Sequence, residues 1–375
     1  DYDQDGDPDL VLAREWDALA LFENEGGAFR EVTAEAGLAR YRGWWNGVAS
    51  GDFTGDGRPD LVATNWGLNS PYRVDDPERP LKTYYGDFNG DRRGELVEAY
   101  YEPTLGAYVP RRQLGAFEAA GLAFVSRAKS HRAFAEATLE EILGFDPDER
   151  LPARTLSTTA HTLFVNEGGG RFSARPLPRE AQLAAAFHAG VADFDGDGLE
   201  DLFLSQNFFG MRAGVPRLDA GRGLWLRGDG RGGFEAVPAP VSGVAVYGEQ
   251  RAAALGDLDQ DGRVDLAVAQ NAAATKLYRN RAGRPGLTVR LRGPARNRAG
   301  VGPSVRLVYA DGRKGPRREL QAGAGYWSQA SATQVLGYGA ECPVRLEVRW
   351  FDGRQTAVEV VEGRRTYTVD HPETR

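Results

Sequence analysis

The chain has 375 residues, of which 26% are charged and 41% are apolar, and its formal net charge is −7. This length can hold two or three domains with buried cores, and the composition is typical of a globular protein. No apolar run reaches the roughly eighteen residues that a membrane-spanning helix requires, so the sequence predicts no transmembrane segment. The single cysteine, Cys342, excludes a disulfide framework within the chain.

An acidic stretch opens the chain at Asp1–Leu10 and recurs at Asp52–Leu61, Asp87–Leu96, Asp193–Leu202 and Asp257–Leu266. Polar or acidic residues stand at positions 1, 3, 5 and 9, and an apolar run follows each copy. Calcium takes six to eight oxygen ligands, which suits this alternation, and a glycine at position 6 permits the sharp turn. The predicted calcium ligands are Asp1, Asp3, Asp5, Asp9, Asp52, Thr54, Asp56, Asp60, Asp87, Asn89, Asp91, Glu95, Asp193, Asp195, Asp197, Asp201, Asp257, Asp259, Asp261 and Asp265.

The five copies are not equivalent, and they differ from an EF-hand. An EF-hand needs a glutamate at position 12 and flanking helices, whereas an apolar strand such as Leu202–Leu204 follows here at once. Thr54 and Asn89 are neutral ligands, and Arg92 replaces the glycine of the third copy, which is therefore the weakest site. Because the chain begins inside a loop, we expect that the natural N-terminus, with any export signal, precedes Asp1.

The acidity of the chain is concentrated in these loops. Removing their eighteen acidic ligands changes the net charge from −7 to +11. Converging carboxylates repel one another unless a cation lies between them, so we expect calcium to be a structural ligand. The positive remainder is mostly scattered arginine without the basic aromatic platform that single strands need, so no nucleic-acid partner is predicted.

A second repeated feature follows the acidic loops. Leu21–Phe29 reads as two strands around a glycine turn, and the pattern returns at Leu163–Phe172 and Leu224–Phe234, with a partial copy at Leu277–Asn280. An acidic hairpin followed by a glycine hairpin makes four strands, which is one propeller blade. The sequence therefore predicts an all-β, calcium-binding β-propeller over residues 1–284, with at least five blades visible and seven expected in the intact protein.

Irregular spacings predict insertions in this plan. No glycine hairpin is found between Asp60 and Asp87, so the second blade is predicted to be short, and Leu163–Phe172 is assigned to the blade of the third loop. A small helical insertion is predicted at about residues 106–160, because Arg111–Ala120 and Ala128–Gly144 have helical apolar spacing. Within it, residues 138–141 fit a capping box.

The pattern changes near Arg284, and residues 285–375 are predicted to form a separate, smaller β domain without acidic loops. Its strands are expected at Leu287–Arg292, Ser304–Tyr309, Val344–Trp350 and Ala357–Val361.

Two sets of motifs resemble known families. The D-x-D-x-D-G-x-x-D-L loops resemble FG-GAP or VCBS repeats, the blades of integrin-alpha-like propellers. The C-terminal stretch resembles a UnbV/ASPIC domain through Asn297–Val305, Gly323–Gln329, Gly337–Gly339 and Trp350–Gly353, although Phe351 stands where proline is usual. The resemblance implies a calcium-stabilised protein that is extracellular, periplasmic or on the cell surface, without assigned chemistry.

The interpretation that follows is a non-enzymatic binding or adhesion protein whose ligand is a glycan or a protein. We predict the ligand site on the rim opposite the acidic loops, where planar polar side chains and tryptophans gather and the helical insertion acts as a wall or lid. The alternative is that these asparagines cap turns and the tryptophans pack between blades. The predicted ligand residues are Trp45, Asn46, Asn65, Trp66, His188, Asn207, Arg251 and Asn271.

A polysaccharide lyase or hydrolase is the alternative function, because propellers also carry enzymes. Its acid and base would come from His131, His161 and His188, the histidines that could meet. A lone rim histidine is more often a packing residue, and the sequence has no nucleophile elbow, HExxH or phosphate loop. The sequence does not indicate an oligomeric state.

Overall fold

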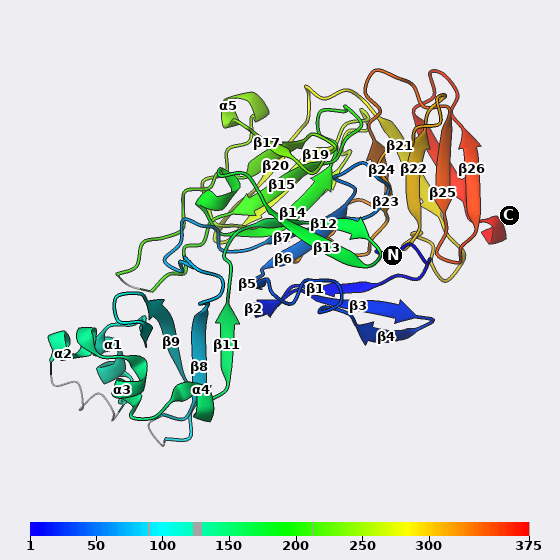
Figure 1. Cartoon of the computed structure of the whole chain (residues 1–375). Coiled ribbons are helices and arrows are strands. Elements are labelled where there is room, and N and C mark those ends of the chain that lie inside the picture. Colours follow the sequence, from blue (N-terminus) through cyan, green and yellow to red (C-terminus); the bar gives the residue numbers. More distant parts are fainter. Residues whose placement is uncertain (89–90, 123–129, 213, 375) are drawn as a thin grey trace.

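A computed structural model describes residues 1–375 except 89–90, 123–129, 213 and 375. The protein is almost entirely β, with many antiparallel sheets and a few short helices, as predicted. Figure 1 shows three parts: a propeller-like body, a lobe that projects from it, and a C-terminal β domain packed beside the body. No helix among the described residues has both the length and the apolarity to cross a membrane.

Four sheets of the body follow one plan, and we number them 1 to 4. Their strands are, in sheet 1, β1 (Leu10–Leu12), β3 (Ala20–Glu25) and β4 (Ala28–Glu31); in sheet 2, β6 (Gly47–Gly51), β7 (Asp60–Thr64), β12 (Thr162–Gly168) and β13 (Arg171–Pro176); in sheet 3, β14 (Ala186–Ala192), β15 (Asp201–Gln206), β16 (Leu224–Gly228) and β17 (Phe234–Val237); and in sheet 4, β18 (Gln250–Gly256), β19 (Asp265–Gln270) and β20 (Ala273–Tyr278).

Sheet 3 shows the plan in full. An acidic loop joins its first two strands, and the glycine hairpin joins the last two, so all four strands are antiparallel neighbours. Apolar side chains that alternate along these strands fill the space between consecutive sheets. The first strands β6, β14 and β18 lie side by side, which gives the propeller-like arrangement.

The assignment of hairpins to sheets differs from the sequence prediction. The hairpin Leu163–Phe172 belongs to sheet 2, because β12 pairs with Leu61–Ala63 of β7. The second sheet is therefore complete and not short. The third acidic loop lies outside sheets 1–4, between β8 (Leu81–Gly86) and β9 (Glu95–Glu102).

The sheet and helices of the lobe lie within residues 81–156, so the lobe is larger than the helical insertion predicted at 106–160. Its four-stranded sheet has the order β10-β9-β8-β11 and adds β10 (Ala107–Pro110) and β11 (Ala153–Leu156). Its apolar core joins Tyr84 and Val97 of this sheet to the helices. The helices are α1 (Leu114–Ala119), α2 (His131–Glu136), α3 (Leu139–Leu143) and α4 (Pro147–Arg150).

Helices α1, α2 and α3 lie within the two predicted helical segments, of which residues 128 and 129 are outside the described part of the chain, whereas α4 was not predicted. The capping box is confirmed: the Thr138 hydroxyl accepts from the Glu141 N–H, and the Glu141 carboxylate accepts from the Thr138 N–H. The lobe joins the body through β11, which lies against β2 (Glu15–Ala18) and β5 (Arg42–Trp44).

The C-terminal domain consists of two sheets around one apolar core that includes Leu346, Trp350 and Tyr367. Strands are present at all four predicted places. The strands are β24 (Gln334–Leu336), β21 (Leu287–Arg292) and β27 (Thr366–Asp370) in one sheet, and β23 (Arg318–Glu319), β22 (Ser304–Val308), β25 (Arg345–Arg349) and β26 (Gln355–Glu359) in the other. The remaining short helices are α5 (Ala239–Ser242) and two 3₁₀ turns, Ala181–Leu183 and Pro372–Thr374.

Candidate functional site

The acidic loops, numbered 1 to 5 in chain order, are shaped by their own carboxylates. In loop 2 the position-1 carboxylate of Asp52 accepts from the N–H groups of Asp56 (3.1 Å) and Gly57 (3.0 Å). In loop 5, Asp257 accepts from Asp261 and Gly262 in the same way. These bonds wrap the backbone around the position-1 side chain, which turns the side chains of positions 3 and 5 toward it.

Position 6 shows why the motif needs glycine. Its φ is positive in the four body loops: +113° at Gly6, +85° at Gly57, +92° at Gly198 and +83° at Gly262. An L-residue adopts this region only at a cost in conformational energy. In loop 3, Arg92 takes φ +67°, so the loop keeps the turn with a strained residue.

Position 9 has a structural role that the sequence did not reveal. The Asp60 carboxylate accepts from the N–H of Phe53 (3.0 Å) at position 2 and from the N–H of Asn166 (2.8 Å) on β12. Asp201 makes the equivalent pair of bonds to Phe194 and Gly228. This buried carboxylate therefore braces the loop against the third strand of its own sheet.

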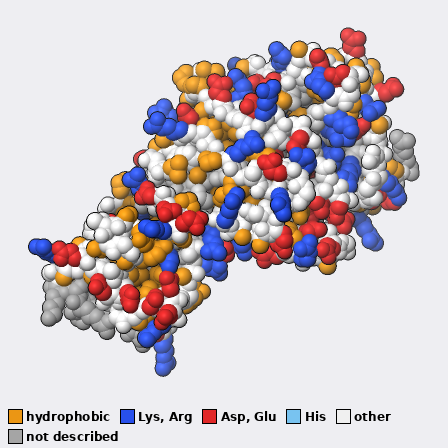
Figure 2. Space-filling view, viewed as in Figure 1, with side chains coloured by type: hydrophobic (Ala, Val, Ile, Leu, Met, Phe, Trp, Pro, Cys, Tyr) orange, Lys and Arg blue, Asp and Glu red, His pale blue; other side chains and the backbone are white. Residues whose placement is uncertain are grey.

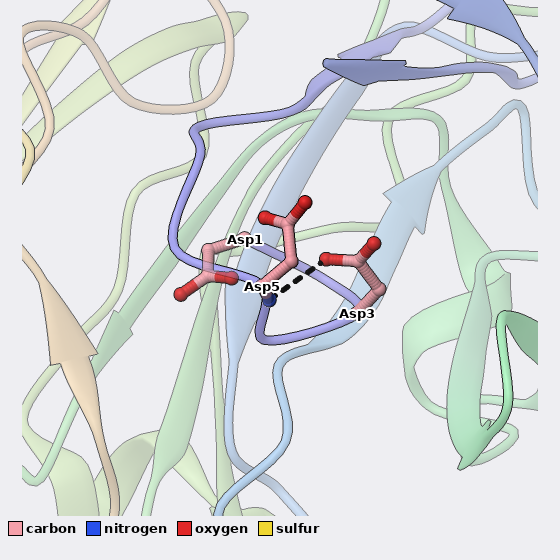
Figure 3. Close-up of side chains that lie close together, drawn as sticks. All are labelled: Asp1, Asp3 and Asp5. Carbon is pink, nitrogen blue, oxygen red and sulfur yellow. Dashed lines mark hydrogen bonds between the residues drawn. The ribbon is translucent and has the colours of Figure 1, made fainter. Parts of the chain in front are cut away.

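Four of the loops bring three carboxylates close enough to share one ion. Their oxygens lie within 4.8 Å of one another in each set, and Figure 3 shows the set of loop 1 with the Asp5 N–H donating to Asp3 Oδ1 (3.2 Å). Loop 2 has no such set among the described residues, because Thr54 replaces a carboxylate and donates to Asp60. Asn89 lies outside the described residues. The sets are Asp1, Asp3 and Asp5; Asp87, Asp91 and Glu95; Asp193, Asp195 and Asp197; and Asp257, Asp259 and Asp265.

Burial makes the charged form of several of these carboxylates unfavourable when no cation is nearby. Desolvation raises the pKa of Asp52 and of Asp193 to about 7, and that of Asp201 to about 8, with the neighbouring carboxylates adding to the shift. Arginine side chains lie against the outer oxygens, as in the Arg227–Asp195 pair (2.8 Å) and the Arg279–Asp259 pair (2.7 Å). Hard oxygen donors with this unbalanced negative charge fit a calcium ion.

The tryptophans predicted on the opposite rim lie inside the protein. Trp45 is 1% exposed and packs between sheets 1 and 2 against Phe164. Trp66 is 5% exposed and packs against Trp44 and Phe208. Both tryptophan side chains are therefore buried packing residues and do not line an open ligand site.

The predicted polar rim residues are mostly engaged by the backbone. Asn46 donates to the Ala186 carbonyl (2.8 Å), and Asn65 accepts from the Trp66 N–H (2.8 Å). Asn207 exchanges hydrogen bonds with Gly221, and Arg251 donates to the Asn207 carbonyl (3.0 Å) and lies over the Phe187 ring. Asn271 is exposed, and its backbone N–H donates to the Glu249 carbonyl, while its side chain has no hydrogen bond among the described residues. The prediction that these side chains converge as an open ligand site is thus contradicted by their burial and bonding.

An aromatic cluster occupies this rim instead, and it ends on an exposed side chain. Phe187 and Phe208 pack with Trp66, and Tyr326 of the C-terminal domain packs edge-on against Phe187. Trp327 stacks on Tyr326, is 89% exposed and has φ +48°. Sequence analysis did not select Trp327, although it lies in the Gly323–Gln329 motif; a tryptophan beside a tyrosine in a glycine-rich loop was the available signal.

The three histidines of the enzyme hypothesis lie apart. His131 begins α2 of the lobe, which Figure 1 places far from the body. His161 is fully buried, where its ring accepts from the Asn65 N–H and contacts the Ala184 carbonyl, and burial lowers its pKa to about 4. His188 is also buried with a pKa of about 4, next to Gly325. No pair of them forms an acid–base site in the described structure.

The C-terminal domain contacts the body directly at loop 4. Arg318 binds Glu200 through two bonds of 2.7 and 2.8 Å, with both side chains mostly or fully buried. Gly337 approaches Asp193 so closely that a β-carbon there would lie 1.8 Å from Asp193 Oδ2. The glycine of this motif is therefore needed for docking. On the face shown in Figure 2, positive and negative side chains are interspersed over both body and lobe, without a field of one sign.

Comparisons with known proteins agree with this architecture. A family model of an FG-GAP-like repeat matches residues 1–63, and a model described as ASPIC and UnbV matches residues 293–375. No curated protein matches the chain. The chain thus carries an FG-GAP-like repeat at its N-terminal end and an ASPIC and UnbV domain at its C-terminal end, and FG-GAP repeats are typical of extracellular proteins.

Proposed function

From an FG-GAP-like repeat joined to an ASPIC and UnbV domain, we propose that this protein is a calcium-stabilised extracellular binding protein without catalytic activity. The observation that carries the proposal is the sets of three carboxylates, whose oxygens lie within 4.8 Å of one another at corresponding places in sheets 1, 3 and 4. The ligand is a glycan or a protein, and the surface proposed for it is the exposed end of the aromatic cluster at Trp327.

The carboxylate sets support calcium as a stabilising ion. Two carboxylates 4–5 Å apart repel by roughly 3–4 kcal/mol at an effective dielectric constant near 20, and an ion between them reverses the sign of that interaction. The residues that would hold the ion in loop 4 are Asp193, Asp195 and Asp197, with backbone or water oxygens completing the shell. A calcium ion there supplies charge neutralisation and a fixed geometry.

The loops also bond to neighbouring sheets, so an ion that fixes a loop fixes the joint between sheets. The Asn166 side chain donates to the Tyr2 carbonyl of loop 1 (2.8 Å), and Asn280 donates to the Phe194 carbonyl of loop 4 (2.7 Å). In loop 2 the Phe53 carbonyl accepts from the Gly232 N–H of sheet 3 (2.9 Å). Position 2 of loops 1, 2 and 4 therefore faces the glycine hairpin of the next sheet.

Thermal unfolding with and without a chelator tests the role of calcium. We expect calcium to raise the midpoint, since a ligand of the native state alone stabilises it by about 2.7 kcal/mol per site at a hundredfold excess over Kd. Magnesium, which requires a tighter octahedral shell, should raise the midpoint less. Equal midpoints with calcium and with chelator would contradict the proposal.

Binding to the aromatic rim is tested by a glycan array and by pull-down of extracellular matrix proteins. Because the Trp327 side chain is 89% exposed, Trp327→Ala should leave the fold intact while weakening ligand capture. Tyr247→Ala, which also removes an exposed ring (66% exposed) from the body, is the matched control. Turnover of a captured glycan would instead favour the enzyme alternative.

A further inference from the structure

A cavity of about 130 Å³ lies where the body meets the C-terminal domain. The inner strands β6, β14 and β18 supply one wall through Ser50, His188 and Leu255, and the C-terminal domain supplies the other through β22, β23 and β25. This volume holds several water molecules, and its wall contains charged side chains from both parts.

The arginines in and around the cavity are paired with carboxylates, with one exception. Arg306 and Arg345 occupy the two carboxylate oxygens of Glu347. Arg349 binds Asp1 at 3.0 Å, and Arg318 takes both oxygens of Glu200. Each of these carboxylates therefore already has a cationic partner.

Arg317 is the arginine left over. It lines this cavity and also a smaller one of about 40 Å³ beside Glu347, and it has no ion pair or side-chain hydrogen bond among the described residues. Its pKa is lowered, first by burial and then by the neighbouring Arg306 and Arg349, and the carboxylates of Asp52 and Glu347 offset this only in part, yet a guanidinium remains charged at neutral pH. A half-buried cation beside like charges is unfavourable unless an anion accompanies it.

A second, independent feature of the same cavity is His188. Its side chain is 2% exposed, and neither ring nitrogen has a hydrogen-bond partner among the described residues. Gly190 and Gly325 lie close to the ring, so its orientation is fixed by packing. Buried ring nitrogens without partners are costly, and a polar ligand in the cavity offers one.

We propose that this cavity is a binding site for a small oxyanion, with Arg317 as its principal contact, Arg349 beside it and His188 as a further polar contact. The fork of a guanidinium matches two oxygens of a carboxylate or of a sulfate-like group. Glu319 also lines the wall and has no ion pair among the described residues, so it opposes anion binding without abolishing it. The site lies between the two parts, so its occupant joins them.

Isothermal titration of the whole chain at constant ionic strength tests the site, with chloride as the reference salt. Acetate and sulfate are the probes, because they separate a planar carboxylate from a tetrahedral oxyanion. We expect one equivalent of one probe to bind at millimolar concentration or tighter. Arg317→Gln should weaken this binding at least about tenfold, and Arg317→Lys should be intermediate because lysine keeps the charge and loses the fork.

Two further variants keep the test independent of folding defects. Glu319→Gln should strengthen binding, since it removes a like charge from the wall, and a stability loss could not imitate that result. Arg298→Gln, an exposed arginine of the same domain, should bind as the parent does. No binding of either probe by the parent chain would overturn the proposal. So would equal affinities of Arg317→Gln and Arg298→Gln for the probe.

Discussion

Asp195 and Asp201 belong to the same motif, yet their side chains have different surroundings and different bonding partners. Asp195 stands at position 3, where its outer oxygen pairs with Arg227 near the surface. Asp201 is fully buried at position 9 and binds two backbone N–H groups on separate strands. One residue type in one motif thus belongs to a predicted ion site in the first case and binds the sheet in the second.

We therefore expect the effect of one aspartate substitution to depend on calcium and the effect of the other to be independent of calcium. Asp201→Ala should destabilise the protein by about 2–4 kcal/mol with chelator as well as with calcium, because two buried N–H groups lose their acceptor. Asp195→Ala should be nearly neutral in chelator and should lower the midpoint only in calcium. Denaturant unfolding of both variants in both conditions measures the contrast. Equal losses in chelator would show that the two positions have one role.

The glycine hairpins act as joints between sheets. Asn166 on β12 is 1% exposed and bonds to its own loop and to the loop of the preceding sheet. Asn24 holds the same place in sheet 1, but within the described part of the chain its side chain bonds only to its own sheet, at the Pro8 carbonyl and the Gly27 N–H. The same hairpin motif is therefore an internal joint in one sheet and a surface turn in the other.

We expect Asn166→Ala to cost about 2–3 kcal/mol, since it leaves the Tyr2 and Pro59 carbonyls without a buried donor. Asn24→Ala is the matched control and should cost less than about 1 kcal/mol, because water replaces its exposed bonds. Chemical denaturation followed by tryptophan fluorescence compares them. A control variant as unstable as Asn166→Ala would show that the loss comes from the hairpin turn itself.

The acidic loops, the hairpins and the C-terminal strands could be predicted because each depends on local spacing. The partner of β7 could not, because ninety-seven residues separate it from β12 and either acidic loop 2 or loop 3 could precede the hairpin Leu163–Phe172. Arg92 was the available signal: it stands where a body loop has glycine. The rim prediction failed for a related reason. Burial of Trp45, Asn65 and Asn207 depends on which sheets become neighbours, and residue type does not report that.

At the scale of the whole molecule, the body and the C-terminal domain share a buried ion pair, Arg318–Glu200. Gly337 and Gly339 dock on loop 4, and the Ser331 N–H donates to Leu255 of β18. Loop 4 therefore contributes to sheet 3, to a predicted calcium site and to the domain interface together. We expect the two parts to unfold as one cooperative unit.

Breaking the interface pair should separate the two parts. Arg318→Met leaves a buried Glu200 without its partner and should cost about 3–5 kcal/mol, whereas the double variant Arg318→Met with Glu200→Met should recover much of that loss. Calorimetry should show one transition for the parent chain and two for Arg318→Met. A single transition in every variant would contradict a coupling through this pair.

The raised aspartate pKa values predict how calcium stabilisation varies with pH. Asp193, which belongs to the carboxylate set of loop 4, has a folded pKa of about 7 against about 4 in the unfolded chain, so without calcium its contribution to stability is present below pH 4 and is lost as pH rises through 7. Protons and calcium compete for the oxygens of Asp193. The midpoint in calcium minus the midpoint in chelator should therefore grow from pH 5 to pH 8.

His161 and His188 have lowered pKa values, so they remove stability as pH falls from 6.5 toward 4. This effect is the same with calcium and with chelator, so it cancels when one midpoint is subtracted from the other. Differential scanning at matched ionic strength gives the two midpoints. A difference that is constant over this range would mean that Asp193 does not hold the ion.

The position of the lobe within sheet 2 has a consequence for biosynthesis. The chain leaves the body after β7 and returns at β12, the neighbouring strand of the same sheet. At a translation rate of about 5–20 residues per second, β7 leaves the ribosome on the order of 5–20 seconds before β12 exists. The lobe has its own apolar core, so we expect it to fold in the interval between the synthesis of β7 and that of β12. The nascent chain then exposes the edge of a buried strand, and a chaperone that shields strand edges would raise the yield of folded protein.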